Sequence, residues 1–100
     1  MSTQTTNELA LLRAEIDRID KELVALFSSR MHLCAAVADY KRRTGMAVTD
    51  PTREQELLDR VATLSPTETR ECTKELYQTI LSLSRSYQTA LLNQSTPETE

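Results

Sequence analysis

The chain has few of the residues that turns and β-sheets need. Its 100 residues include one glycine, three prolines, one phenylalanine, three tyrosines and no tryptophan. This composition argues against a β-sandwich or barrel and favours long helices. No apolar run approaches the ~20 residues that a membrane-spanning helix needs. The first residues also lack the basic and apolar segments of a secretory signal. We therefore expect a soluble, all-helical protein.

Cysteine and histidine are also scarce, and the net charge is slightly negative. Cys34 and Cys72 do not form a CxxC pair, and a single histidine is not enough for a histidine-based metal site. We expect no metal and no cofactor, with both thiols reduced in a cytoplasmic protein. A net charge of −3 argues against nucleic acid or an anionic membrane as the partner.

The first half of the chain has the apolar pattern of a long helix. Apolar residues recur at alternating spacings of three and four, as in a coiled coil. They are Leu9, Leu12, Ile16, Ile19, Leu23, Leu26, Leu33, Val37 and Tyr40. Nothing in 7–43 breaks a helix, and Asn7 is suited to cap it. Such a helix would be about 55 Å long, whereas a globule of this size is about 26 Å across. We expect a second copy of the chain to cover its apolar seam.

Two further helices follow. Gly45 is expected to end the first helix. Asp50 and Pro51 form a cap and a first-turn proline, which predicts a short helix ending near residue 64. Ser65 and Glu68 have the spacing of a capping box, so the last helix should begin there and continue to about residue 93.

We find no internal repeat and no sign of a second domain. The expected organisation is one all-α domain over 1–100, with disordered tails at 1–6 and 94–100. Its order is a long helix, a short helix and a long helix. We expect no dehydrogenase, dehydratase or synthase domain in this chain, and the sequence leaves open whether it is free-standing or part of a fusion.

Polar residues interrupt the apolar seams. Arg30 occupies the one missing seam position of the first helix, and Ser84 and Gln88 do the same in the last helix. Lys41 lies close to three turns after Arg30, about 16 Å along the axis, so the two point nearly the same way. Arg13 would lie about 42 Å from Lys41 on the same helix, and an antiparallel second copy would bring it nearer. Each residue could instead fix helix register or extend to water. Several inward cations together favour a dianionic ligand, because an unpaired buried charge is costly.

These residues form a recognisable set. The fragments are "LLRAEID", "SSRM", "ADYKRR", "DPTRE" and "LSRSYQ". Across 8–93 the chain resembles the all-helical chorismate mutase family. The resemblance implies an intertwined homodimer of three-helix chains. It also implies rearrangement of the dianion chorismate to prephenate, with no cofactor, metal or nucleophile.

The resemblance also implies roles for the seam residues. Arg30 would bind one substrate carboxylate, and Arg13 from the partner chain would bind on the other side. Arginine suits this because its planar fork binds a carboxylate through two hydrogen bonds. Lys41 and Gln88 would donate to the ether oxygen, where negative charge develops during the reaction. The predicted catalytic residues are therefore Lys41, Gln88 and Arg30.

The remaining predicted site residues are expected to help bind the substrate. By the same resemblance, Glu54 and the backbone near Asp50 would hold the ring hydroxyl of the substrate. Arg53 would steady the loop and add positive potential. Ser84 would contact a carboxylate, and Val37 would form an apolar wall.

Three rival functions stay open at this point. An isochorismate-pyruvate lyase resembles the mutases but usually lacks the loop acid, so "DPTRE" favours the mutase. A mutase acting on 4-amino-4-deoxychorismate needs a similar site, and the sequence does not distinguish a ring amine from a ring hydroxyl. A non-catalytic helical dimerisation module would use the polar seam residues only to set register.

Overall fold

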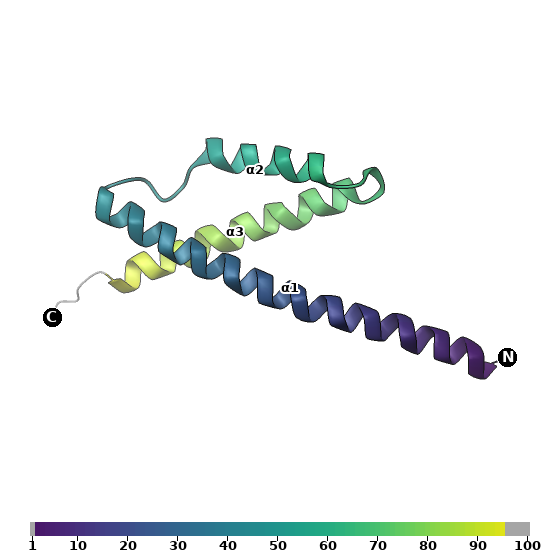
Figure 1. Ribbon diagram of the computed structural model, residues 1–100. Coiled ribbons are helices and arrows are strands. Elements are labelled where there is room, and N and C mark those ends of the chain that lie inside the picture. Colours follow the sequence, from purple (N-terminus) through teal and green to yellow (C-terminus); the bar gives the residue numbers. More distant parts are fainter. Residues whose placement is uncertain (1, 96–100) are drawn as a thin grey trace. The chain divides into compact units, whose positions relative to one another are not determined.

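A computed structural model describes the backbone of residues 2–95 and the side chains of residues 7–93. The regular secondary structure of the described residues is all helical, in the predicted order of long, short and long (Figure 1). The elements are α1 (Ser2–Thr44), α2 (Pro51–Leu64), the 3-10 turn η1 (Thr67–Thr69) and α3 (Arg70–Ser95). The chain divides into two compact units, residues 1–32 and 33–100. The all-α class predicted from the sequence is confirmed.

The start of α1 differs from the prediction. The helix begins at Ser2, so Asn7 is an interior residue and not the cap. The backbone of 2–6, expected to belong to a disordered tail, continues the helix, because no proline or glycine interrupts it. Of the other expected tail, 94–100, residues 94 and 95 end α3, and residues 96–100 lie outside the described residues.

The end of α1 is closed by glycine, as predicted. Gly45 has a φ of 75°, a left-handed conformation that side-chain-bearing residues rarely adopt. This turn lets the N–H of Met46 donate to the carbonyl oxygen of Lys41 at 2.8 Å, the long hydrogen bond of a Schellman motif. Three basic residues, Lys41, Arg42 and Arg43, lie in the last turn, where the helix dipole favours positive charge.

The carboxylate of Asp39 pairs with the two arginines of this turn. Asp39 Oδ2 accepts a hydrogen bond from Arg43 Nε at 2.9 Å, and Oδ1 accepts one from Arg42 Nη2 at 2.6 Å. The hydrogen bonds from Arg43 and then Arg42 lower the pKa of Asp39 below its ordinary value. This cluster is exposed, so it contributes little to the stability of the fold.

The start of α2 also agrees with the prediction. Asp50 is the N-cap, and its Oδ1 accepts a hydrogen bond from the backbone N–H of Arg53 at 3.1 Å. Pro51 is the first helical residue, where its missing N–H costs no hydrogen bond.

The predicted capping box before α3 is wrong. Ser65 closes α2 instead, because its hydroxyl donates to the carbonyl oxygen of Val61 at 2.7 Å. The turn that follows has Pro66 at its cap, without a side-chain cap hydrogen bond. Arg70 instead satisfies acceptors at the end of α2, since its guanidinium donates to the carbonyl oxygens of Ala62 at 2.8 Å and Ser65 at 3.0 Å. The end of α2 is therefore stabilised by the start of α3.

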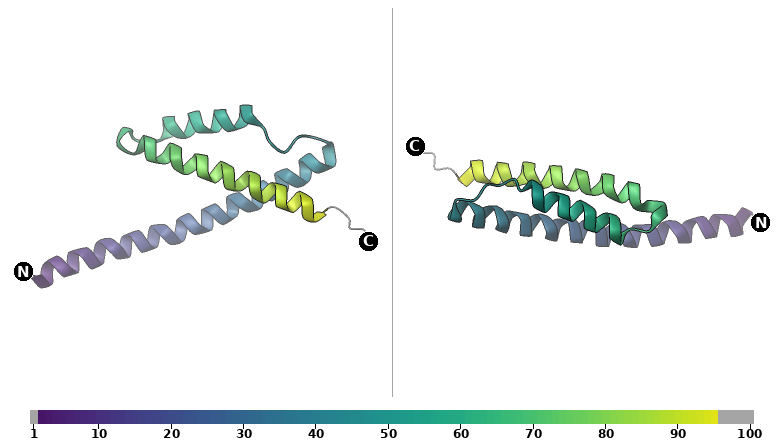
Figure 2. Two further views of the ribbon diagram at one scale, coloured as in Figure 1. Left: turned by 180° about the vertical axis from the view of Figure 1, so that it is seen from behind. Right: turned by 90° about the horizontal axis from the view of Figure 1, so that it is seen from above.

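Helices α2 and α3 lie side by side and antiparallel (Figures 1 and 2). The short turn over 65–69 requires this arrangement, because it reverses the chain between them. Val61 of α2, Leu81 of α3 and Ala38 of α1 are the buried apolar residues among those described. Such a core is small for a chain of this length.

The unit formed by residues 1–32 is a helix with an exposed apolar seam. Its seam residues expose between 46% and 67% of their surface. They are Leu9, Leu12, Ile16, Ile19, Leu23 and Leu26. Within the described part of the chain, no helix is long and apolar enough to cross a membrane. The seam predicted from the heptad spacing is therefore present and largely uncovered.

Candidate active site

Lys41 lies in the last turn of α1 and is half-buried. Its Nζ donates a hydrogen bond to the carbonyl oxygen of Val48 at 2.9 Å. This bond, with the Met46 to Lys41 backbone bond, fixes the loop that leads to Asp50. An ammonium group has three donors, so this bond leaves Lys41 donors for a ligand.

Ser84 and Gln88 are buried one turn apart on α3, exposing 5% and 8% of their surface. Gln88 Nε2 donates to the backbone carbonyl oxygen of Cys34 at 2.9 Å. The thiol of the same Cys34 lies 3.7 Å from Ser84 Oγ, within hydrogen-bonding range for sulfur. The polar seam residues of α3 therefore meet the part of α1 that belongs to the same unit. Sequence reasoning missed Cys34, because a backbone carbonyl acceptor has no sequence signature.

Glu54 lies on the first turn of α2 and is paired with α3. Its Oε1 accepts a hydrogen bond from Arg85 Nη1 at 2.5 Å, and the two groups form an ion pair. Sequence reasoning missed this role of Arg85, although the residue stands inside the quoted fragment "LSRSYQ". Opposite charges 31 residues apart have no pairing signal in a single sequence.

The other predicted residues of this unit lie nearer the surface. The carboxylate of Asp50 is occupied as the cap of α2, so a ligand would meet its backbone rather than its side chain. The side chain of Arg53 is exposed beside it. Val37 is 45% exposed, one turn before Lys41 on α1.

Arg13 and Arg30 belong to the other unit, residues 1–32. Arg13 is exposed and Arg30 is half-buried. They stand 17 residues apart on one helix, about 25 Å along its axis. A small ligand cannot contact both arginines of the same chain.

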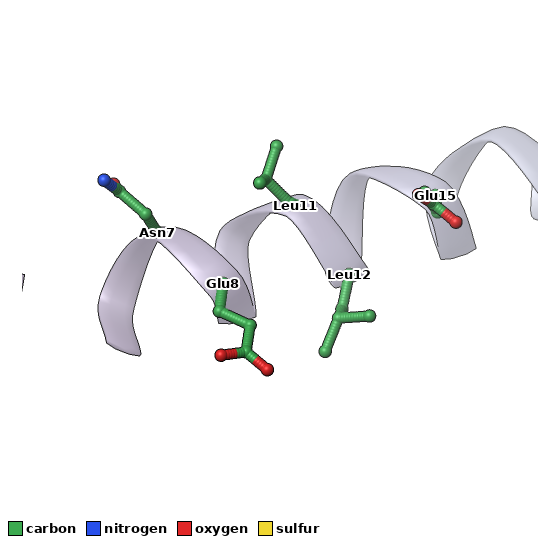
Figure 3. A pocket seen from close by; sticks show the side chains of 5 residues that line it. All are labelled: Asn7, Glu8, Leu11, Leu12 and Glu15. Atoms are coloured by element: carbon green, nitrogen blue, oxygen red, sulfur yellow. The ribbon is translucent and has the colours of Figure 1, made fainter. Parts of the chain in front are cut away.

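Three hollows of the described surface are not lined by these residues. The hollow in Figure 3 is lined by a single stretch of α1, with Leu11 and Leu12 projecting from the helix. A second hollow, around Asp17 and Val24, is also built on α1 alone. A third has Ala38 and Leu91 among its lining residues. A depression along one helix cannot enclose a ligand, so we do not assign the first two as sites.

Metal-ligating side chains do not gather in the described residues. No group of three or more His, Cys, Asp or Glu side chains could hold a metal ion there. Cys34 and Cys72 form no disulfide bond in the described residues.

Comparison with known proteins identifies the family. Residues 12–89 match the sequence profile described as "Chorismate mutase type II". The chain belongs to the chorismate mutase type II family. All nine residues predicted to form the site, from Arg13 to Gln88, fall within this range. The family resemblance inferred from the sequence is therefore confirmed.

Individual proteins match the chain over shorter stretches than the family profile does. The chain is 37% identical over 57 residues to the chorismate mutase of Methanocaldococcus jannaschii. That match covers 57% of this chain and 58% of the Methanocaldococcus protein. It is 34% identical over 58 residues to the bifunctional chorismate mutase/prephenate dehydratase of Aquifex aeolicus. That match covers 58% of this chain and 16% of the Aquifex protein. It is also 41% identical over 51 residues to the T-protein of Enterobacter agglomerans. That match covers 51% of this chain and 14% of the T-protein. No solved structure matches the chain significantly.

Proposed function

We propose that this chain is a chorismate mutase that converts chorismate to prephenate. The observation that carries the proposal is the family match over 12–89, a range that contains every residue predicted to form the site. The matched proteins include one named chorismate mutase and one named for that activity together with a second. The chain spans 58% of the first and 16% of the second, so the activity itself requires the assay below.

The reaction asks the protein for positioning and charge. In one cyclic step the ether C–O bond breaks and a new C–C bond forms, with no proton or electron exchanged with the protein. The substrate must be held in a compact conformer, and negative charge develops on the ether oxygen. A preorganised site with cations and amide donors supplies both requirements.

Lys41 and Gln88 are the proposed donors to the ether oxygen. Each side chain is anchored by one hydrogen bond to a backbone carbonyl, at Val48 and Cys34 respectively. A lysine has three N–H donors and a glutamine amide has two, so each retains a donor for the substrate. The anchoring supports the proposal because donors aligned before the reaction need no reorganisation in the transition state.

Arginines supply the charge that binds the substrate carboxylates. Arg30 and the partner's Arg13 are the proposed carboxylate ligands, and the hydroxyl of Ser84 contributes a further hydrogen bond. Arg53 adds positive potential, and Val37 lines the apolar side of the substrate. Glu54 accepts a hydrogen bond from the ring hydroxyl, and the backbone near Asp50 supports it.

The proposed site needs a second copy of the chain. The seam of α1 exposes about half of each apolar residue, and water contact with that surface favours association. The long separation of Arg13 and Arg30 supports the same conclusion, because only another chain can bring an Arg13 near Arg30. We therefore propose an intertwined homodimer in the cytoplasm, where both cysteine thiols would stay reduced.

A mixing experiment tests the contribution from the second chain. Arg13→Ala and Lys41→Ala should each be almost inactive alone. After subunits exchange at random, hybrid dimers contain one intact site, so the mixture should regain roughly a quarter of wild-type activity. If Arg13 acts within its own chain, every site in the mixture keeps a defect and no activity returns.

The activity itself is tested by supplying three substrates. Purified protein is incubated separately with chorismate, isochorismate and 4-amino-4-deoxychorismate, and the products are identified by chromatography and mass spectrometry. We expect prephenate from chorismate. Pyruvate with salicylate from isochorismate would indicate a lyase, and turnover of the amino compound alone would indicate the alternative mutase. Turnover of none of the three would favour a dimerisation module.

A further inference from the structure

The ion pair between Glu54 and Arg85 joins α2 to α3 at the carboxylate proposed to hold the ring hydroxyl. Glu54 Oε1 lies 2.5 Å from Arg85 Nη1. The Glu54 side chain is 23% exposed and that of Arg85 is 40% exposed. The hydrogen bond and ion pair described for the Glu54 side chain use Oε1, so Oε2 remains as a further acceptor oxygen.

We propose that Arg85 is a positioning residue that makes Glu54 select a neutral ring hydroxyl over a ring ammonium group. The inference rests on the proposed function and deepens it, because it names the substituent that the substrate carries. Arg85 acts through Glu54 and is not expected to contact the substrate.

The first step of the argument is geometric. A glutamate side chain has several rotamers and a freely turning carboxylate. The hydrogen bond from Arg85 to Oε1 restricts this rotation and leaves Oε2 as the acceptor. A hydroxyl donor on the substrate can then meet a carboxylate oxygen whose position is already set.

The second step is electrostatic. The guanidinium of Arg85 carries a positive charge that balances the charge of Glu54. The hydrogen bond from a neutral ring hydroxyl to Glu54 is not weakened by this charge neutralisation, because the hydroxyl needs only an acceptor oxygen. A ring amine is protonated near neutral pH, as aliphatic amines are. It would gain less from a carboxylate that is already paired, and Arg85 would repel it.

The test compares two substrates that differ at this one substituent. kcat/KM is measured for chorismate and for 4-amino-4-deoxychorismate with the wild type, Arg85→Met, Arg85→Lys and Arg60→Met. Methionine keeps much of the apolar stem of arginine without its charge. Arg60→Met is the matched control, because Arg60 is an exposed arginine further along α2. The ratio of the two kcat/KM values does not depend on the folded fraction of each preparation.

We expect Arg85→Met to shift this ratio toward the amino compound by about tenfold, an estimate from two unit charges near the protein surface. Arg85→Lys should keep the ratio within roughly threefold of the wild type, because it retains the charge. Arg60→Met should leave the ratio unchanged.

Two results overturn the inference. An unchanged ratio in Arg85→Met, with both substrates slowed equally, means that Arg85 binds the common part of the substrates or only supports the fold. An equal shift in Arg60→Met means that the effect comes from net charge and not from the pair. In both cases the wild type still produces prephenate and the proposed function stands. A wild type that converts neither compound removes the proposed function and the inference together.

Discussion

Replacing Lys41 with methionine should separate catalysis from stability. Methionine retains much of the apolar length of lysine and removes the ammonium group. In the proposed site, that group donates to the ether oxygen as its negative charge develops. In the described structure, it also donates to the carbonyl oxygen of Val48 at 2.9 Å. The substitution therefore removes a transition-state interaction and a loop contact together, and their expected magnitudes differ.

The catalytic loss should be the larger of the two. Removing one preorganised donor from a developing oxyanion lowers kcat by about 10²–10³, or about 2.7–4 kcal/mol. A hydrogen bond from a charged donor contributes about 1.5–3 kcal/mol to stability. Lys41 is half-buried, so water can replace much of that bond at Val48. We expect a loss near 1 kcal/mol, which corresponds to a fall in Tm of about 4–8 °C for a chain of this size.

Two measurements check this prediction. Chorismate consumption gives kcat and KM, and thermal unfolding followed by circular dichroism gives Tm. Lys74→Met is the matched control, because it removes the same charge from an exposed ion pair with Glu71 on α3. Lys41→Met should lower kcat far more than it raises KM, while Lys74→Met should change neither. A Lys41→Met enzyme within tenfold of wild-type kcat would refute the role of this ammonium group.

Three further outcomes follow from the same structure. Gln88→Leu should lower kcat by about 100-fold. Its Tm should stay within about 5 °C of the wild type, because a net loss of about 1 kcal/mol is partly offset by the apolar leucine; unfolded protein would contradict this. Ile16→Asp should dissociate the proposed dimer in sedimentation experiments, because burying an unpaired carboxylate is costly, and Val24→Asp, off the seam, should not. The lowered pKa of Asp39 means that its contribution to stability is present above its ordinary pKa of 3.8 and is lost as the pH falls through the lowered value. The Tm difference between wild type and Asp39→Asn should therefore disappear in strong acid, and its persistence there would contradict the assigned cause.

The helices were predictable because their signals are local. Gly45 ends α1, and Asp50 with Pro51 starts α2, as their backbone preferences require. Two local predictions were wrong because alternatives competed for the same groups. Asn7 can cap a helix, but the preceding residues continue one. Ser65 can cap the following helix, but its hydroxyl donates backward to Val61 instead.

The candidate site was predictable in part. The residues that interrupt apolar seams stood out, because packing alone would favour leucine at those positions. Burial of Ser84 and Gln88 agrees with that interpretation. Their roles toward a substrate stay predictions, as do those of Arg13 and Arg30. The partners of the buried groups could not be predicted. Gln88 donates to the backbone carbonyl oxygen of Cys34, and because every residue type has a backbone carbonyl, the sequence does not mark this acceptor.

The sequence by itself determined the helical class, the helix order, the exposed seam and the family, because each depends on local spacing or on residue identity. Only the tertiary structure decided which groups meet across helices. Arg85 pairs with Glu54, Gln88 reaches Cys34, and Lys41 bonds the loop at Val48. The physical reason is that such contacts depend on the distance and the crossing angle between two helices. That geometry is set by packing over many residues and is not written at any one position.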